Sequence, residues 1–131
     1  MKTTKRLGIW MDHSIANLIK ISKDAIVIKT IEATPLLTGK FKNLKKDENL
    51  KQNKEKNQLS IFYKKISEII KEYKEVVLFG PTDAKNELMN LLKSDHLFEN
   101  IKIEAINADK MTENQQQAFV KNYFNLFEKN H

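Results

Sequence analysis

Hydrophobic residues in the first quarter of the chain alternate with polar ones. Apolar positions recur at every second residue in 7–11 and in 15–21, and the segment 25–31 is rich in β-branched residues. A period of two and a β-branched composition are both typical of a β-strand. Short polar turns at 12–14 and 22–24 join the three segments, and connections this short join only antiparallel strands. The pattern therefore predicts an antiparallel meander of three strands.

The pattern changes to helical spacing after the polar stretch that precedes Leu59. Apolar residues then recur every three or four positions as far as Tyr73, which predicts an amphipathic helix. This helix could begin as early as Glu48, because the residues before Leu59 are good helix formers and contain no proline. Residues 76–79 form a continuous apolar run, typical of a buried central strand, and residues 101–105 alternate again.

Capping residues predict two further helices. Thr82 and Asp83 follow a break at 80–81 and can cap a helix with a leucine-rich face. Thr112 and Gln115 match a capping box, in which each side chain bonds the other residue's amide, and an aromatic stripe follows. The order β-β-β-α-β-α-β-α predicts one mixed five-stranded sheet covered by helices. We expect this α/β (α+β mixed sheet) architecture to be of the ribonuclease-H-like group of folds.

Length and composition limit the classes of protein. The chain has 131 residues, which favours a single domain over 1–131. It has no cysteine, which excludes disulfide scaffolds, cysteine nucleophiles and thiolate metal sites. No apolar run is long enough to span a bilayer, and no signal-peptide core follows the first residues. We therefore expect a cytoplasmic protein without a membrane partner.

The net charge of +6 is concentrated in two places, a basic arm at 1–6 and a polar segment at 39–58. Segment 39–58 has seven lysines against three acidic residues, and is expected to be a loop or an extension of the following helix. Such a cluster favours contact with nucleic-acid phosphates. The alternative is a solvated surface in a lysine-rich chain whose only arginine is Arg6. The lysines of the segment are Lys40, Lys42, Lys45, Lys46, Lys51, Lys54 and Lys56.

A second candidate for anion binding is the joint between strand 76–79 and the next helix. A helix N-terminus favours an anion, and Thr82 and Lys85 lie in or beside its first turn. The alternative is a plain strand–turn–helix joint with Lys85 in solvent. The joint is not a P-loop, because the second glycine and the Lys-Ser/Thr pair of that motif are missing.

Three carboxylates could carry chemistry, since Asp12, Asp83 and Asp109 each follow a predicted strand. Nucleases with a ribonuclease-H-like fold hold two metal ions with acidic residues at strand ends. The alternative is turn and cap chemistry, which favours Asp at the same positions. His13 could act as a general acid or base, but no nucleophile is identified beside it. No HExxH spacing occurs, and the sequence implies no cofactor and no resident metal.

Several segments together resemble a known family. The hairpin GIWMDHSIANLIKI, the joint VVLFGPTDAK and the order of elements are similar to the central domain of archaeal and eukaryotic peptide-chain release factors and of the rescue factor Pelota. In that family a strand ends in Gly-Pro-Gly before a helix with a lysine. Gly80, Pro81 and Lys85 match this motif, whereas Thr82 replaces the second glycine. The closing stretch INADKMTENQQQAFVKNYF is similar to a small bacterial group related to that domain.

One departure from the family changes the expected function. Release factors carry Gly-Gly-Gln between the third strand and the first helix, and no two glycines are adjacent here. Gln58 alone does not restore the motif, whose backbone conformation relies on glycine. Pelota's central domain also lacks the tripeptide. The resemblance therefore implies a non-catalytic, translation-related binding module that contacts the ribosome or RNA. The alternatives are a metal-dependent nuclease that uses the three carboxylates, and a protein-interaction or self-association module at a sheet edge.

Overall fold

Five strands form one mixed sheet in the computed structural model, which describes residues 5–21, 26–33 and 48–129, the last with backbone alone at 48–57 and 125–129. The sheet order is β3-β2-β1-β4-β5. β1 pairs with β2, and β2 with β3, in antiparallel fashion, whereas β1–β4 and β4–β5 are parallel. The strands are β1 (Arg6–Met11), β2 (Ile15–Ile21), β3 (Ile26–Glu32), β4 (Glu75–Gly80) and β5 (Lys102–Asn107).

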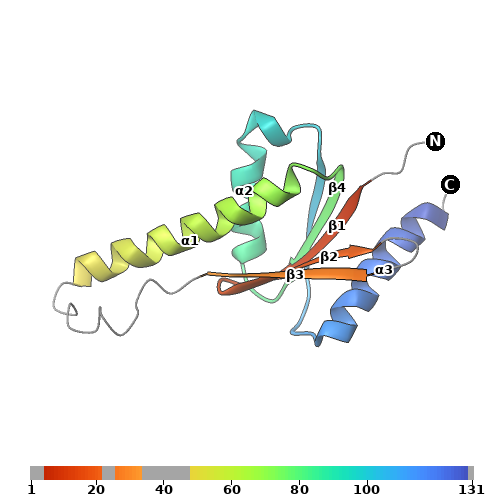
Figure 1. Ribbon diagram of the computed structural model, residues 1–131, viewed down its shortest axis with the longest axis horizontal. Helices are drawn as coiled ribbons and strands as arrows, with labels where there is room; N and C mark the ends of the chain where they lie inside the picture. Colours follow the sequence, from red (N-terminus) through yellow and green to blue (C-terminus); the bar gives the residue numbers. More distant parts are fainter. Residues whose placement is uncertain (1–4, 22–25, 34–47, 130–131) are drawn as a thin grey trace.

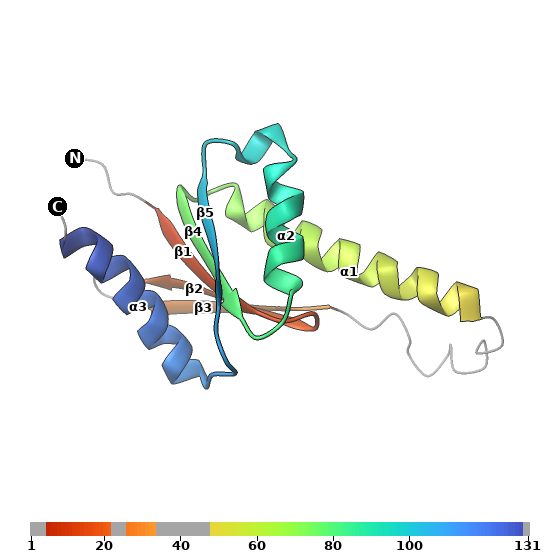
Figure 2. The same cartoon turned by 180° about the vertical axis from the view of Figure 1, so that it is seen from behind.

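Helices cover both faces of the sheet (Figures 1 and 2). Helices α1 (Glu48–Ile70) and α2 (Ala84–Lys93) pack on one face, and α3 (Glu113–Lys129) packs on the other. Successive side chains of a strand point to opposite faces, so the alternation divides the core into two clusters. In β1, Leu7 and Ile9 belong to the α1–α2 side, whereas Trp10 belongs to the α3 side.

Helix α1 extends well beyond the sheet at its N-terminal end (Figure 1). Its apolar stripe begins at Leu59, and the buried residues Phe62, Ile66 and Ile70 continue it over the sheet. The turns before Leu59 carry no such stripe in the sequence, and their backbone continues the helix beyond the sheet. The structure thus places 48–58 in the helix, while 39–47 of the lysine-rich segment lies outside the described residues.

Two glycines allow close approaches that the fold requires. Gly80 ends β4 with φ of 152°, and a Cβ there would lie 2.1 Å from the carbonyl oxygen of Met11. Its backbone conformation and this contact both exclude a side chain. A Cβ on Gly8 would lie 2.3 Å from Cγ2 of Val120, so β1 and α3 approach each other closely only because Gly8 has no side chain.

The structure confirms the predicted order of elements and the predicted fold class. The capping box is also confirmed: Thr112 Oγ1 accepts from the Gln115 amide at 3.2 Å, and Gln115 Oε1 accepts from the Thr112 amide at 2.9 Å. The short 3₁₀ turn η2 (His96–Phe98) was not predicted. Arg6, the last residue of the predicted basic arm, is the first residue of β1, and its guanidinium contacts Glu75. Within the described residues, no helix has the length and apolar character needed to cross a membrane.

Candidate functional site

The carboxyl ends of β1, β4 and β5 meet at one edge of the sheet, because the three strands are parallel. Open α/β sheets commonly bind ligands at this edge, where the connecting loops leave a crevice. The residues after the three strands include Asp12, Thr82, Asp83 and Asp109. The topology therefore brings the predicted carboxylates and the predicted anion site to the same edge.

Each carboxylate at this edge has a different local role. Asp12 Oδ1 accepts hydrogen bonds from the amides of Ser14 at 2.7 Å and Ile15 at 2.9 Å, which closes the β1–β2 turn. Asp83 stands at the N-cap of α2 without a side-chain cap bond, and its Oδ1 lies 3.4 Å from Asn86 Nδ2. Asp109 helps to line a shallow depression of about 270 Å³. The other lining residues are Gly80, Pro81, Asn107 and Ala108.

These carboxylates do not assemble into a set of metal ligands. Across the described ranges, His, Cys, Asp and Glu side chains form no group of three or more that could hold a metal ion. The nuclease alternative requires Asp12, Asp83 and Asp109 to converge within coordination distance. The observed bonds of Asp12 are instead those of the turn chemistry that was the other interpretation of this position.

Lys85 is a buried residue whose ammonium group faces the backbone of the turn before α2. Its side chain is 2% exposed, and Nζ donates a hydrogen bond of 2.6 Å to the carbonyl oxygen of Thr82. The Thr82 hydroxyl accepts from the Ala84 amide at 3.2 Å. The interpretation that placed Lys85 in solvent is therefore wrong. Lys85 and Thr82 brace the turn between β4 and α2, and their predicted contact with phosphate stays a prediction.

Three side chains from three elements meet beside this edge: His13 from the β1–β2 turn, Tyr63 from α1 and Glu87 from α2. The Tyr63 hydroxyl donates to Glu87 Oε1 at 2.6 Å, and His13 Nε2 lies 3.2 Å from the same oxygen. The Tyr63 hydrogen bond lowers the pKa of Glu87, burial opposes this shift, and His13 adds to the lowering. Burial, followed by the Glu87 carboxylate, raises the pKa of Tyr63.

Sequence reasoning identified only one member of this His13–Tyr63–Glu87 cluster. Tyr63 lies beside the apolar stripe of α1, and Glu87 lies among the polar residues of α2. The three residues are distant in sequence, and no spacing rule connects them. A carboxylate on an imidazole nitrogen can orient a general base. However, His13 and Glu87 have side chains that are 42% and 47% exposed, so the cluster is a surface linkage between elements.

The lysine-rich segment is separate from the carboxyl-edge residues in the part of the chain that is described. Lys51, Lys54 and Lys56 lie in the N-terminal half of α1, which extends away from the sheet (Figure 1). The other lysines of the segment lie outside the described residues: Lys40, Lys42, Lys45 and Lys46.

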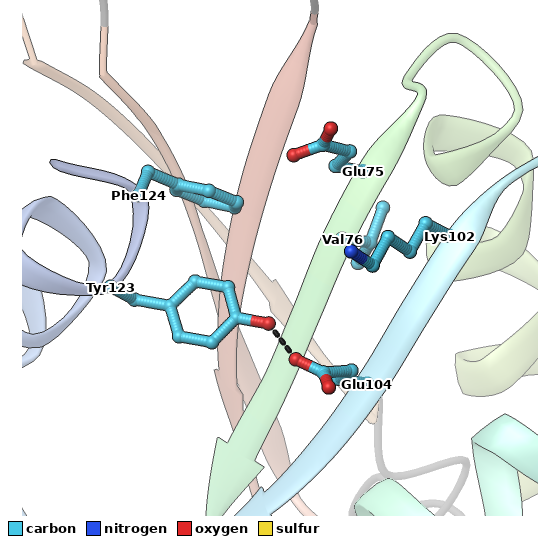
Figure 3. A pocket seen from close by; sticks show the side chains of 6 residues that line it. All are labelled: Glu75, Val76, Lys102, Glu104, Tyr123 and Phe124. Carbon is cyan, nitrogen blue, oxygen red and sulfur yellow. Dashed lines mark hydrogen bonds between the residues drawn. The ribbon is translucent and has the colours of Figure 1, made fainter. Parts of the chain in front are cut away.

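A second hollow lies at the opposite edge of the sheet, under α3 (Figure 3). Its volume is about 20 Å³, which leaves room for about one water molecule. The Tyr123 hydroxyl bonds to Glu104 beside the hollow. The Arg6 guanidinium lies 5.7 Å from the ring centre of Phe124. These contacts fasten α3 to the sheet, and the hollow is too small for a substrate.

Comparisons with known proteins agree with this topology. No family model matches the sequence, and no curated protein is similar to it. Among solved structures, Pelota from Archaeoglobus fulgidus is similar over 92% of this chain, with a TM-score of 0.59 and 10% identity. Pelota from Thermoplasma acidophilum is similar over 90%, with a TM-score of 0.58 and 14% identity. The archaeal translation termination factor aRF1 is similar over 95%, with a TM-score of 0.50 and 15% identity.

The chain matches only part of each of these proteins. It covers 32% of each Pelota chain and 40% of aRF1. At such low sequence identity the likeness establishes the fold. The resemblance to the release-factor and Pelota central domain that the sequence indicated is confirmed at that level.

Proposed function

We propose that this chain is a non-catalytic binding module of the translation machinery, which contacts the ribosome or RNA through segment 39–58. The observation that carries the proposal is the fold likeness to Pelota over about nine-tenths of the chain, at a TM-score of 0.59. A fold alone does not define a function, so the proposal also draws on the sequence of the module. A ribosomal partner would place the protein in the cytoplasm.

The glycine content supports a role without peptide release. The chain has three glycines, Gly8, Gly39 and Gly80, and none is adjacent to another. The release chemistry that the resemblance would otherwise imply requires adjacent glycines. The nuclease alternative lacks comparable support, because the described carboxylates do not gather into a set of three metal ligands. Binding is then the activity that the chain is best equipped for.

The charge distribution supports phosphates as the ligand. Seven of the lysines lie in 39–58, and the backbone of 48–58 extends beyond the sheet within α1. A segment that projects from the domain can reach into the grooves of a folded RNA. Lysine contacts with phosphates release counterions, so the affinity should fall steeply with rising salt.

The test is co-sedimentation of the tagged protein with ribosomes from its own cells, at low and at moderately high salt. We expect co-migration at low salt and release at high salt. A variant in which the seven lysines of 39–58 are replaced by alanine should stay at the top of the gradient. A steep loss is expected, because each phosphate contact contributes to the salt dependence.

The matched control replaces seven exposed lysines elsewhere, so that the net charge changes equally. This control should still co-migrate if the binding surface is segment 39–58. An equal loss of co-migration in both variants would show that net charge, and not segment 39–58, determines binding. A wild-type protein that never enters the ribosome fractions would refute the ribosomal partner. The control lysines are Lys64, Lys65, Lys71, Lys74, Lys93, Lys110 and Lys121.

A further inference from the structure

Strand β3 is an outer strand of the sheet (Figure 1), and five of its seven residues are exposed. It pairs with β2 on one side, and no strand within the described residues pairs with its other side. Ile26 and Val27 are 44% and 57% exposed. An unpaired strand edge offers backbone donors and acceptors to a further strand. The other outer strand, β5, keeps its apolar residues partly buried beneath the helices.

The uncovered part of β3 and its neighbour β2 carry only positive charge on the α1 side. Val27 and Lys29 point to this side, because their partners on β2 are Lys20 and Leu18, and Leu18 belongs to the α1–α2 core. Helix α1 covers the far end of the strand, where Ile31 is 8% exposed. Lys20 and Lys29 are both exposed. Among the described residues of β2 and β3 that face this side, none is acidic.

The α3 side of the same edge is mainly apolar at its start. Ile26 and Ile28 pair with Ile21 and Ile19, and Ile28 packs against the α3-side core. A strand added to β3 would lie about 4.8 Å away, with its side chains alternating between the two sides. It would therefore place every second residue beside Val27 and Lys29, with Lys20 of β2 one strand further in on the same side, and the intervening residues beside Ile26 and Ile28.

We propose that the free edge of β3 binds an extended segment of a partner protein in which acidic and apolar residues alternate. The segment adds a sixth strand to the sheet, with its acidic side chains toward Lys20 and Lys29 and its apolar side chains toward Ile26 and Ile28. Backbone hydrogen bonds supply affinity in this mode of recognition, and the alternating side chains supply specificity. The inference goes beyond the proposed contact with RNA and uses a different surface.

A second copy of the chain fits this edge less well than an acidic segment. Lys29 is the central residue of β3 (Ile26–Glu32). If two copies of β3 paired antiparallel along their whole length about a two-fold axis, Lys29 would face Lys29 of the other copy. Like charges directly opposite each other destabilise a strand pair. The charge on the edge thus disfavours self-pairing and favours an acidic partner.

The test is an NMR titration of the ¹⁵N-labelled full chain with two synthetic peptides. The probe alternates glutamate and valine along the length of β3, and the control peptide has lysine in place of each glutamate. We expect the glutamate peptide to shift the amide signals of β3 and β2 and to bind about fivefold more tightly than the lysine peptide. The double variant Lys20→Glu/Lys29→Glu should reverse this preference.

The matched variant Lys110→Glu/Lys121→Glu changes the net charge equally at two other exposed lysines, and should keep the wild-type preference. Three results would overturn the proposal. The β3 signals could stay in place, both peptides could bind equally, or the β3 signals could move with protein concentration in the absence of peptide. The last result would identify a second copy as the occupant. None of these results depends on ribosome binding, which is tested through 39–58.

Discussion

On the α1–α2 side of the sheet, the buried side chains are mainly aliphatic and the helices pack through their apolar stripes. On the α3 side the buried core is richer in aromatic residues, and Phe79 stacks on Phe119 at a centroid distance of 4.2 Å. That side also contains a buried polar network. Asn17 Nδ2 donates to Gln116 Oε1 at 2.9 Å, and Asn17 Oδ1 accepts from Thr30 Oγ1 at 2.9 Å.

The helices on the two sides also differ in how they are connected to the sheet. α1 and α2 are crossover helices, so the strands before and after them already limit where they can lie. α3 follows β5, and no strand comes after it among the described residues. Its position is fixed by three specific contacts with the sheet: Val120 against Gly8, Gln116 with Asn17, and Phe124 under Arg6. Among the described residues, these contacts rather than a crossover hold α3 on the sheet.

The largest expected effect is on the α1–α2 side. Phe62→Ala removes a ring that is 1% exposed at the centre of the α1 contact, and should lower the free energy of unfolding by about 4 kcal/mol. Urea denaturation measures this loss. The neighbouring Ile61→Ala, at a side chain that is 48% exposed, should change it by less than about 0.5 kcal/mol. Similar losses in both variants would contradict the docking of α1 through this stripe.

On the α3 side, a change at Gly8 tests the close approach of strand and helix. Gly8→Ala puts a methyl group against Val120, and should cost about 2 kcal/mol of unfolding free energy. Val120→Ala alone leaves a cavity and also destabilises the fold. The double variant should be more stable than the sum of the two single effects predicts, by about 1 kcal/mol. Simple additivity in the thermodynamic cycle would show that the two residues do not constrain each other.

The buried amide network gives a somewhat smaller effect. Asn17→Ala leaves Gln116 Oε1 and the Thr30 hydroxyl without their partner, and should cost about 1.5 kcal/mol. Hydrogen exchange should also become faster in the first turns of α3, because Gln116 anchors that end of the helix. The control is Asn90→Ala at an exposed position of α2, for which we expect no loss of stability. Unchanged hydrogen exchange in α3 would show that the amide network does not hold this helix in place.

The smallest effect concerns the His13–Tyr63–Glu87 cluster, which links α1 to α2. Tyr63→Phe removes the hydroxyl that donates to Glu87, and should cost about 1 kcal/mol near neutral pH. The pKa of Glu87 is lowered by folding, so its contribution is present above the ordinary value of 4.5 and is lost as the pH falls through the folded pKa. The pKa of Tyr63 is raised, so its contribution is lost as the pH rises above 10.0.

The difference between wild type and Tyr63→Phe should therefore be widest between pH 4.5 and 10.0, and should narrow on both sides. Urea denaturation over a pH series measures it. Tyr73→Phe is the control: burial also raises the pKa of Tyr73, with a smaller effect of Glu72. This control should share the alkaline change but not the acidic one. An acidic change of equal size in both variants would contradict the Glu87 linkage.

Much of the fold could be predicted from local patterns. Strands β1 and β2 were located from a period of two, and the docked half of α1 from a period of three to four. The capping box at Thr112 placed the start of α3. These features depend on residues close in sequence, where spacing and backbone preference determine the local structure.

The candidate site was less predictable, because its contacts join distant residues. Sequence placed Asp12, Thr82 and Asp83 at strand ends but could not decide what their side chains bond. It left two interpretations of Lys85 open, and the structure shows a buried ammonium on the Thr82 carbonyl. Glu87 and Tyr63 were missed because their 24-residue separation matches no helical or strand spacing.

The sequence by itself determined the order of the elements, the two sides of the sheet, the concentration of lysine in 39–58 and the lack of adjacent glycines. Periodicity and composition determine these, and both are properties of the chain itself. Only the tertiary structure decided which carboxylates fail to converge, where Lys85 directs its charge and which strand edge stays uncovered. These depend on the crossing of strands and helices that are far apart in the chain, because packing selects the partners that each polar side chain can reach.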